Sequence, residues 1–453
     1  MIAKHLSSLL LLSLMGCGGR AVVSPAADGG VTDLATLDLA PPLPSGIHAL
    51  TGLSTDLPTD DLQPLKQMIG NAPLVGLGES IHTSGGYHDA KARLIQFLVK
   101  EMGFRVLLLE TPRMDAQVTT DYVKSCTGTP EQAASGIFPV FASSTTRDLL
   151  TWLCQYNQQH PTDPVSFYGF DMQEPWNQGK LLNSYLQKSA PSDAAMLTAG
   201  LSECDGVWSS SEADYYAKEP TPKVDSDQRT SCQNGVAATS SYFSTHKDAL
   251  VAASSIEEFT LAKLALDGLG AWEEEAFYFS SNISLSYLAR DQEMANTVES
   301  LRTLWFPNSK AMLWAHNYHL QKDGEDDVDD VGPKHMGSFL HADFKGDYYP
   351  IGLVGYQVDI DWPTGMGSPC AKLPTPDDDS VEGMLHALDQ SYLLVDLSSS
   401  SAEKPFFDPT QDLNFDGVYD GEAVAGKIAD QFSALVFLDH SPAMTPLFWN
   451  ACP

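Results

Sequence analysis

Positive charge is scarce in this chain of 453 residues, because 26 Lys and Arg stand against 59 Asp and Glu and the formal net charge is −33. A surface this acidic repels the phosphates of nucleic acids and anionic lipids, so we expect no nucleic-acid partner. Long apolar runs are also scarce. Beyond the N-terminal segment, no stretch is long and apolar enough to cross a membrane.

Several catalytic signatures are missing as well. The chain has no Gly-x-Ser-x-Gly nucleophile elbow, no His-Glu-x-x-His and no Cys-x-x-Cys, and residues 76–78 lack the third Gly of a dinucleotide-binding loop. These absences argue against serine catalysis, a zinc protease, thiol redox chemistry and a bound dinucleotide. Any catalysis must therefore come from other groups.

The N-terminus is typical of a secretory signal. Lys4 precedes an apolar run over residues 6–15, and Leu14-Met15-Gly16-Cys17 resembles the lipobox of bacterial lipoproteins, in which the Cys is lipidated. Residues 18–45, rich in Gly, Ala, Pro, Asp and Thr, predict a flexible linker. We expect an exported protein held at a membrane by a lipid on Cys17. The alternative is a plain secretory signal with an incidental Cys.

Six cysteines remain after Cys17, and an even number in an exported protein favours disulfides. Six cysteines allow about 15 pairings, which spacing does not resolve. Proximity along the chain suggests the pairs Cys126–Cys154 and Cys204–Cys232, which leaves Cys370 with Cys452.

The remaining chain, residues 46–453, reads as an α/β domain with a mostly parallel central sheet covered by helices. Apolar runs separated by helical patterns predict buried parallel strands at 73–78, 105–110, 165–171, 310–316, 348–354, 392–397 and 433–439. Helices are expected at 57–69 and 87–102, with Gly103 as the stop. Residues 176–300 lack strong strands and predict an inserted helical lobe, in which the polar segment 213–235 reads as a long loop.

Polar groups follow one predicted strand after another. They are Glu79 with His82, Glu110, Asp171, and His316 with His319. Ligands bind outside the carboxyl ends of the strands in open α/β sheets, so parallel strands would bring these groups to one cleft.

The chemistry of these groups fits acid–base catalysis. A His between carboxylates, such as His82 near Glu79 and Glu110, can take a proton from water. His316 can stabilise an oxyanion or protonate a leaving alkoxide, and Asn317 can add a neutral donor. The alternative is a metal site, because Glu79, His82, Glu110, His316 and His319 are all plausible ligands.

Longer blocks identify a family resemblance. They are GLGESIH at 76–82, YGFDMQ at 168–173, RDQEMANTV at 290–298, WAHNYHLQK at 314–322, MGSFLHADFKGDYYPIGL at 336–353, SVEGMLHAL at 380–388 and FSALVFLDHSPAMTPL at 432–447. Together they resemble the erythromycin esterase family, which includes succinoglycan-biosynthesis-like proteins. The blocks run in family order over about residues 50–450.

The resemblance implies an α/β hydrolase in which a His activates water against an ester or macrolactone carbonyl without a metal. Residue by residue, it implies a general base at His82, supporting acids at Glu79 and Glu110, and further active-site histidines at His316 and His319. It places substrate-binding basic residues at Lys91 and Arg93. Lys91 stands where the family commonly has Arg, and Thr83 where it usually has Gly.

A second motif, DLNFDGVYDGE at 412–422, resembles a calcium-binding loop with ligands at Asp412, Asn414, Asp416 and Asp420 and a turn at Gly417. The expected bidentate acid would stand at Ala423, and Glu422 comes one residue early. The motif predicts a structural calcium ion, or else an acidic surface turn.

We therefore expect an exported hydrolase of small carboxylic esters or lactones, with His82, Glu79, Glu110 and His316 as catalytic residues. Lys91, Arg93, Asp171, Asn317 and His319 are expected to bind substrate. The alternative of another class is a lipoprotein that binds a ligand or metal in the same cleft without hydrolysing it.

Overall fold

The computed structural model describes residues 42–218, 221–322, 335–344, 346–363, 369–398, 413–419 and 422–452. The signal peptide, Cys17 and residues 18–41 of the linker lie outside the described residues, so export and lipidation stay predictions. The first described strand is β1 (Ile47–Ala49), and the domain boundary near residue 46 stays a prediction. No helix in the described ranges is long and apolar enough to span a membrane.

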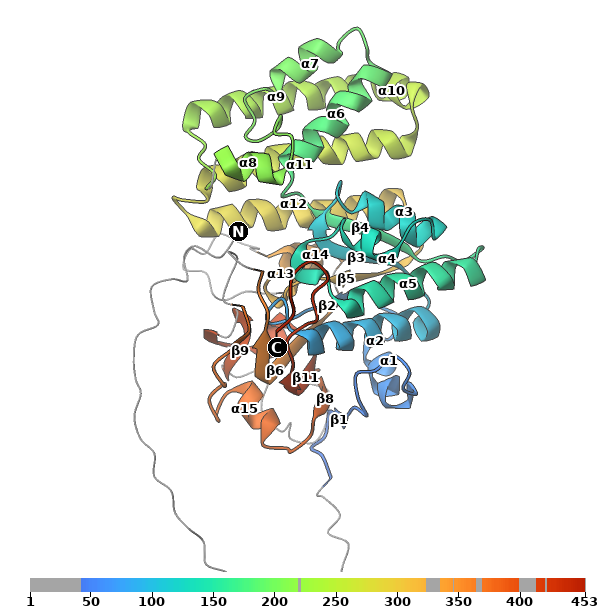
Figure 1. Cartoon of the computed structure of the whole chain (residues 1–453), viewed down its shortest axis with the longest axis vertical. Coiled ribbons are helices and arrows are strands. Elements are labelled where there is room, and N and C mark those ends of the chain that lie inside the picture. Colours follow the sequence, from blue (N-terminus) through green and yellow to red (C-terminus); the bar gives the residue numbers. More distant parts are fainter. Residues whose placement is uncertain are drawn as a thin grey trace, which may run out of the picture.

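One nine-stranded sheet forms the centre of the molecule (Figure 1). Its order is β1, β8 (Tyr392–Asp396), β11 (Ala434–Ser441), β6 (Tyr348–Ile360), β2 (Leu74–Leu77), β5 (Lys310–Trp314), β3 (Phe104–Pro112) and β4 (Ser166–Asp171), and β7 (Ala371–Lys372) pairs with β6. The strands from β11 to β4 are parallel to one another, whereas β1, β8 and β7 pair antiparallel. The predicted mostly parallel sheet is confirmed.

Helices cover both faces of this sheet, which explains why its strands read as continuous apolar runs. In β3, Leu107 and Leu109 join the core formed with α2 (Gly85–Met102) and α5 (Ser144–Gln159), while Val106 and Leu108 join the core formed with α12 (Ile283–Leu304) and α14 (Met336–Phe344). Helix α2 ends as predicted at Gly103, whose positive φ of 74° suits a residue without a side chain.

The other described elements near the sheet are short. They are η1 (Asp60–Leu62), α1 (Gln63–Ile69), α3 (Gln117–Ser125), α4 (Pro130–Ala134), η2 (Pro139–Phe141), α13 (Asn317–Leu320), α15 (Val381–His386), α16 (Ile428–Gln431) and the hairpin of β9 (Leu413–Tyr419) with β10 (Glu422–Gly426). Asp412 and Asp420 of the predicted calcium loop lie outside the described residues. Asn414 and Asp416 lie in β9, and the calcium ion stays a prediction.

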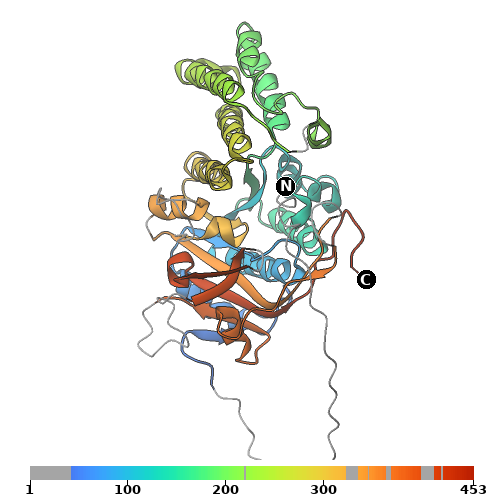
Figure 2. The same cartoon turned by 90° about the vertical axis from the view of Figure 1, so that its left-hand side faces the viewer.

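The predicted helical lobe is present and projects from the sheet-bearing part (Figures 1 and 2). It contains α6 (Pro175–Ser189), α7 (Ala194–Gly200), α8 (Glu212–Lys218), α9 (Ser226–Thr245), α10 (Lys247–Ala253) and α11 (Ile256–Tyr278), with α12 at its junction with the sheet. The expectation of a long loop over 213–235 was wrong, because α8 and the start of α9 occupy it. Asp225 caps α9 by accepting from two backbone amides, and the helix is polar because much of it faces solvent.

The three predicted disulfides form. Their Cα atoms lie 5.3 Å apart in Cys126–Cys154, 4.7 Å in Cys204–Cys232 and 5.4 Å in Cys370–Cys452. The first ties α3 to α5, and the second ties the segment after α7 to α9 in the lobe. The third joins the C-terminal segment to the segment before β7.

Candidate active site

The predicted polar groups converge at the carboxyl end of the parallel strands. Glu79 lies two residues after β2, Glu110 lies near the end of β3, Asp171 ends β4, and His316 lies two residues after β5. Since β2, β5, β3 and β4 are neighbours in that order, these positions fall side by side. The backbone amide of His316 donates to Glu110 Oε2 at 2.8 Å, which joins two of the strand ends directly.

A Glu–His–Lys cluster forms the first half of the site. Glu79 is fully buried and accepts from His82 Nδ1 at 2.7 Å through Oε1, and from Lys91 Nζ at 2.8 Å through Oε2. Burial alone would raise the pKa of Glu79, but the Lys91 ammonium and the His82 hydrogen bond lower it to about 2. Glu79 is therefore a carboxylate over the whole neutral range.

The Glu79 carboxylate selects the tautomer of His82. An ionised carboxylate only accepts hydrogen bonds, so Nδ1 of His82 carries the proton and Nε2 carries the lone pair. In the described part of the chain, Nε2 makes no hydrogen bond. The His82 side chain is 13% exposed, in contrast to the fully buried Glu79 and Lys91. This arrangement leaves a basic nitrogen where solvent can reach it.

Aromatic rings hold the imidazole of His82 in place. Its ring centre lies 4.9 Å from that of Phe141, 5.1 Å from that of His316 and 6.2 Å from that of Trp362, each edge to face. His82 and His316 therefore meet, as the strand-end pattern predicts. Phe141 and Trp362 were not predicted, since nothing in the local sequence ties η2 or the segment after β6 to His82.

Lys91 is a partner of Glu79 rather than a surface contact. It is fully buried, donates to the carbonyl of Ala315 at 3.2 Å as well, and lies 5.0 Å from the Trp314 ring centre. Burial lowers the pKa of Lys91 to about 8, and the charge of Glu79 opposes that effect. Lys91 thus orients Glu79, and its predicted contact with substrate stays a prediction.

A second cluster centres on Arg290 of α12. Its guanidinium donates to Glu110 Oε1 at 2.9 Å and to Asp171 Oδ2 at 2.6 Å, and all three side chains are buried. Burial opposes the charge of Arg290, but Asp171 and Glu110 raise its pKa well above the usual value. Asp171 is therefore an internal ion-pair partner of Arg290, and its predicted contact with substrate stays a prediction.

His319 completes this second cluster. Its Nδ1 lies 2.8 Å from Asp291 Oδ1 and its Nε2 lies 3.2 Å from Glu110 Oε1. Burial opposes protonation, but Asp291 and Glu110 raise the pKa of His319 to about 9, so the ring is an imidazolium at neutral pH. Burial also opposes the charge of Glu110, yet His319 and Arg290 hold its pKa well below the usual range.

The hydrogen bonds described below join the side chains of His316 and Asn317 to backbone groups. Nε2 of His316 lies 2.9 Å from the carbonyl of Ser80, and Nδ1 accepts from the amide of Tyr318 at 3.1 Å, so the ring is neutral with its proton on Nε2. Asn317 donates to the carbonyl of Leu353 on β6 at 2.9 Å. A Cβ on Gly78 would lie 1.8 Å from Asn317 Oδ1, which explains why glycine stands there.

Arg93 does not belong to the site. Its guanidinium donates to the carbonyls of Gly52 and Pro58 at 2.7 Å each and pairs with Asp61, so it fastens α2 to the N-terminal segment. Residues two apart on a helix point in different directions, so Lys91 and Arg93 cannot both face the strand ends. The predicted substrate-binding role of Arg93 is corrected to a structural one.

Arg290 and Asp291 are the site residues that the sequence reasoning missed. They stand in the block RDQEMANTV, which was noted for family resemblance but given no chemical role. The sequence did contain a signal for them. Arg290 and Asp291 lie on the same predicted helix as the apolar residues Met294 and Val298, which belong to the core. Charged residues on the apolar side of a helix need buried partners, which here are Asp171, Glu110 and His319.

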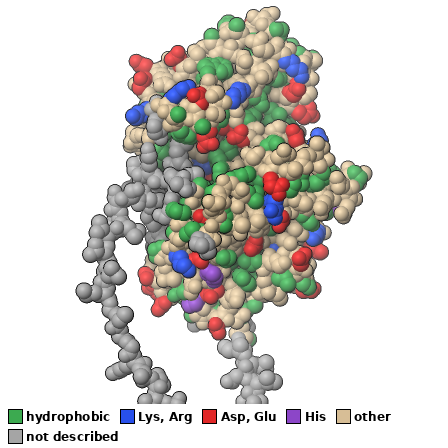
Figure 3. Space-filling view, in the orientation of Figure 1, with side chains coloured by type: hydrophobic (Ala, Val, Ile, Leu, Met, Phe, Trp, Pro, Cys, Tyr) green, Lys and Arg blue, Asp and Glu red, His purple; other side chains and the backbone are tan. Residues whose placement is uncertain are grey.

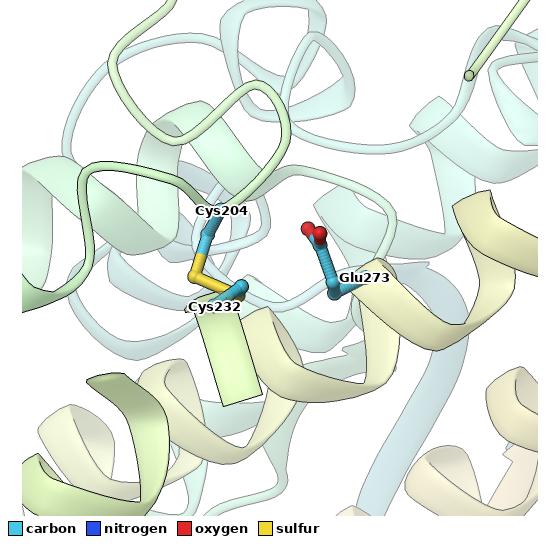
Figure 4. A group of neighbouring side chains, drawn as sticks. All are labelled: Cys204, Cys232 and Glu273. Atoms are coloured by element: carbon cyan, nitrogen blue, oxygen red, sulfur yellow. A yellow bond between two sulfur atoms is a disulfide. The ribbon is translucent and has the colours of Figure 1, made fainter. Parts of the chain in front are cut away.

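Clusters spaced like metal ligands lie elsewhere in the described residues. They are Cys204, Cys232 and Glu273 in the lobe, and Asp361, Cys370 and Cys452. Figure 4 shows Glu273 of α11 beside the Cys204–Cys232 disulfide, whose sulfurs are bonded to each other and offer no thiolate. At the strand ends, Lys91 neutralises Glu79 and Arg290 neutralises Glu110. A metal ion bound there would be repelled by these two buried cations.

Comparisons with known proteins agree with this architecture. The family model for erythromycin esterase matches residues 99–441. The putative hydrolase YbfO of Bacillus subtilis (strain 168) is 23% identical over 409 residues, which cover 87% of this chain and 89% of that protein.

Two solved structures have the same fold. A crystal structure of a Bacillus cereus protein matches with a TM-score of 0.75 at 20% identity, covering 89% of this chain and 97% of that one. A mutant of an erythromycin esterase in its open conformation matches with a TM-score of 0.67 at 20% identity, covering 89% and 99% of the two chains.

Proposed function

Because the chain belongs to the erythromycin esterase family and is a hydrolase, we propose that it cleaves carboxylic esters or lactones with His82 as the base that activates water. The observation that carries the proposal is the 2.7 Å contact of His82 Nδ1 with Glu79, a carboxylate that Lys91 keeps ionised. A carboxylate on one ring nitrogen makes the other nitrogen available as a base.

The reaction follows from these groups. Nε2 of His82 takes a proton from a water molecule, whose oxygen attacks the carbonyl carbon and forms a tetrahedral oxyanion. The imidazolium, stabilised by Glu79, then returns the proton to the leaving alkoxide as the carbon–oxygen bond breaks. We assign His316 to the oxyanion, to which its Nε2–H would turn from the Ser80 carbonyl when substrate binds.

The second cluster, centred on Arg290, fixes the positions of the residues around His316. Glu110 holds the amide of His316 and the side chains of Arg290 and His319 at once. It therefore fixes the strand that carries His316 relative to helix α12. Glu110 is proposed to support catalysis through His316 rather than to contact the substrate.

A hydrolysis screen tests the proposal. Release of acid from simple esters, small lactones and macrolactones would be followed at constant pH for the parent, His82→Ala and the matched surface variant His246→Ala. We expect turnover of some of these substrates by the parent and by His246→Ala, and a loss of about 10²–10⁴-fold in His82→Ala.

Two outcomes would contradict the proposal. Equal turnover by the parent and His82→Ala would remove His82 as the base. Binding of a lactone without any release of acid would favour a ligand-binding protein that uses the same cleft.

A further inference from the structure

The segment that follows β11, residues 442–447, runs past both sides of His82, and we call it the strap. Isolated antiparallel bridges join the strap to Ser84 and to Ser143. Ser84 lies two residues after His82, and Ser143 lies two residues after Phe141, whose ring packs on His82. One short piece of chain is therefore paired with both segments that carry these rings.

Backbone hydrogen bonds fix the strap at the residue next to each ring. The amide of Met444 donates to the carbonyl of Thr83 at 2.9 Å, and the amide of Leu447 donates to the carbonyl of Ala142 at 3.0 Å. The two acceptors directly follow the histidine and the phenylalanine in sequence. The strap therefore helps to set the edge-to-face contact of the two rings, whose centres lie 4.9 Å apart.

The backbone of Thr83 shows why the proposed base needs this support. Its φ is 66°, in the left-handed region that a β-branched residue rarely adopts. Such a conformation persists only where the surrounding structure holds it. The contacts that hold it include the Met444 amide on the carbonyl of Thr83 and the Asp361 amide, which donates to Thr83 Oγ1 at 3.3 Å. If the strap moves, Thr83 can relax, and the backbone that aims His82 relaxes with it.

The Cys370–Cys452 disulfide anchors the chain shortly after the strap. Strand β7 begins next to Cys370 and pairs with the end of β6. Trp362, the third ring on His82, follows the same end of β6 by two residues. The disulfide therefore ties the strap to the part of the chain that carries this third ring.

This disulfide is also the one in the described part of the chain that a reductant reaches most easily. Cys370 is exposed and Cys452 is half-buried, whereas each of the other two bridges contains a buried Cys, which is Cys154 in one and both Cys204 and Cys232 in the other. A thiolate must reach a sulfur atom to open a disulfide. Figures 1 and 2 place the C-terminal end of the chain at the surface, and Figure 3 shows acidic side chains spread over the same face. An uncharged dithiol is therefore a better reductant here than an anionic thiol.

We propose that the strap positions His82 for catalysis and that the Cys370–Cys452 disulfide is the covalent anchor on which this positioning depends. The inference rests on the function proposed above and adds a positioning element to the same site. A dithiol opens the anchor by giving two electrons and two protons to the disulfide, which becomes two thiols, while the dithiol becomes a disulfide itself. Hydrolysis then slows without any change in the residues that react.

Cys370→Ser combined with Cys452→Ser tests the inference on the ester that the parent turns over best. We expect kcat to fall about 10–10²-fold with a smaller change in KM, because a displacement of the base by about 1 Å is enough for such a loss. Cys126→Ser combined with Cys154→Ser is the matched control, since it removes a disulfide that ties α3 to α5 instead. The control variant should keep most of the kcat of the parent.

The parent protein gives a second test without any substitution. In buffers of reduced and oxidised dithiothreitol, kcat should fall in step with the fraction of Cys370 and Cys452 that iodoacetamide alkylates, measured by mass spectrometry, and should return on reoxidation. The far-ultraviolet circular dichroism should stay constant over the same range. Its loss together with kcat would overturn the inference, because the disulfide would then hold the fold rather than the base.

Hydrogen exchange decides the inference independently of activity, so it applies even if the parent hydrolyses no ester and the proposed function fails. Amides within residues 79–88 and 141–147 should exchange faster when the anchor is removed, while those of β4 keep the rate of the parent. Unchanged exchange within residues 79–88 would overturn the inference. Full kcat without the anchor, or equal losses of kcat in the two disulfide variants, would overturn it as well.

Discussion

At the scale of single residues, ion pairing decides which carboxylates of the site stay charged. Glu79 and Glu110 are both buried at strand ends, and each remains ionised because cations lie against it. The sequence predicted both acids and His82 from their places after apolar strands. It did not predict that Lys91 faces Glu79 while Arg93 faces away, because the rotation of α2 depends on packing against the sheet.

Replacing Lys91 by Met tests this pairing. The variant removes the ammonium that lowers the pKa of Glu79, so that pKa rises toward and beyond its ordinary value. Protonated Glu79 lacks the negative charge that stabilises the His82 imidazolium, so the acidic limb of the kcat/KM profile should move to higher pH. Stability should also fall by about 3–5 kcal/mol, because a buried carboxylate loses its partner.

The measurement is a pH–rate profile from pH 4 to 9, together with urea unfolding. Lys188→Met is the control, because Lys188 is exposed and pairs with Glu258 on the surface. Surface pairs of this kind are worth at most about 1 kcal/mol. An unchanged acidic limb in Lys91→Met would show that Lys91 does not set the charge of Glu79.

At the scale of elements, the site is a junction of four neighbouring strands with α12 and α13. The strand ends were predictable, because parallel strands place their carboxyl ends together. The partners of Arg290 on α12 were not, because Glu110 lies 180 residues away in sequence and the local pattern indicates a buried charge without naming its partner. Asp291 then binds both His319 and the amide of Met336, which joins α12 to α13 and α14.

This junction predicts a loss of stability at alkaline pH. The pKa of His319 is about 9 in the folded state against an ordinary value of 6.5, so the folded state binds the proton more tightly. The free energy of folding that the protonated His319 contributes is fully present below pH 6.5 and is lost as the pH rises through 9. The rise of about 2.5 in the pKa of His319, at about 1.4 kcal/mol per pKa unit, corresponds to about 3–4 kcal/mol.

Urea unfolding at several pH values between 6 and 10 measures this effect. The free energy of unfolding of the parent should fall over that range, and His319→Gln should show a flatter dependence. His246→Gln, which changes an exposed lobe histidine, should follow the parent. A parent curve without this fall would mean that His319 is not held as an imidazolium.

At the scale of the whole molecule, the sheet brings together segments that are far apart in sequence. Apolar runs predicted the parallel sheet, and the lack of strong strands over 176–300 predicted the helical lobe. The three disulfides follow the proximity of the cysteines along the chain, which suggested these pairs without excluding others. The strand order and the helices α8 and α9 were not predictable, because they depend on tertiary contacts and on a polar helix surface. Arg113 shows such a contact, since it links the end of β3 to Glu293 on α12.

The central claim is that Glu79 and His82 act as one unit in activating water. A double-mutant cycle on kcat/KM with Glu79→Gln, His82→Ala and the combined variant tests it most directly, with the ester that the parent turns over best. We expect about a 10²–10⁴-fold loss for each single variant and nearly the same loss for the double variant, because the acid works only through the imidazole. Losses that multiply in the double variant would show that the two residues act independently, and would contradict the account.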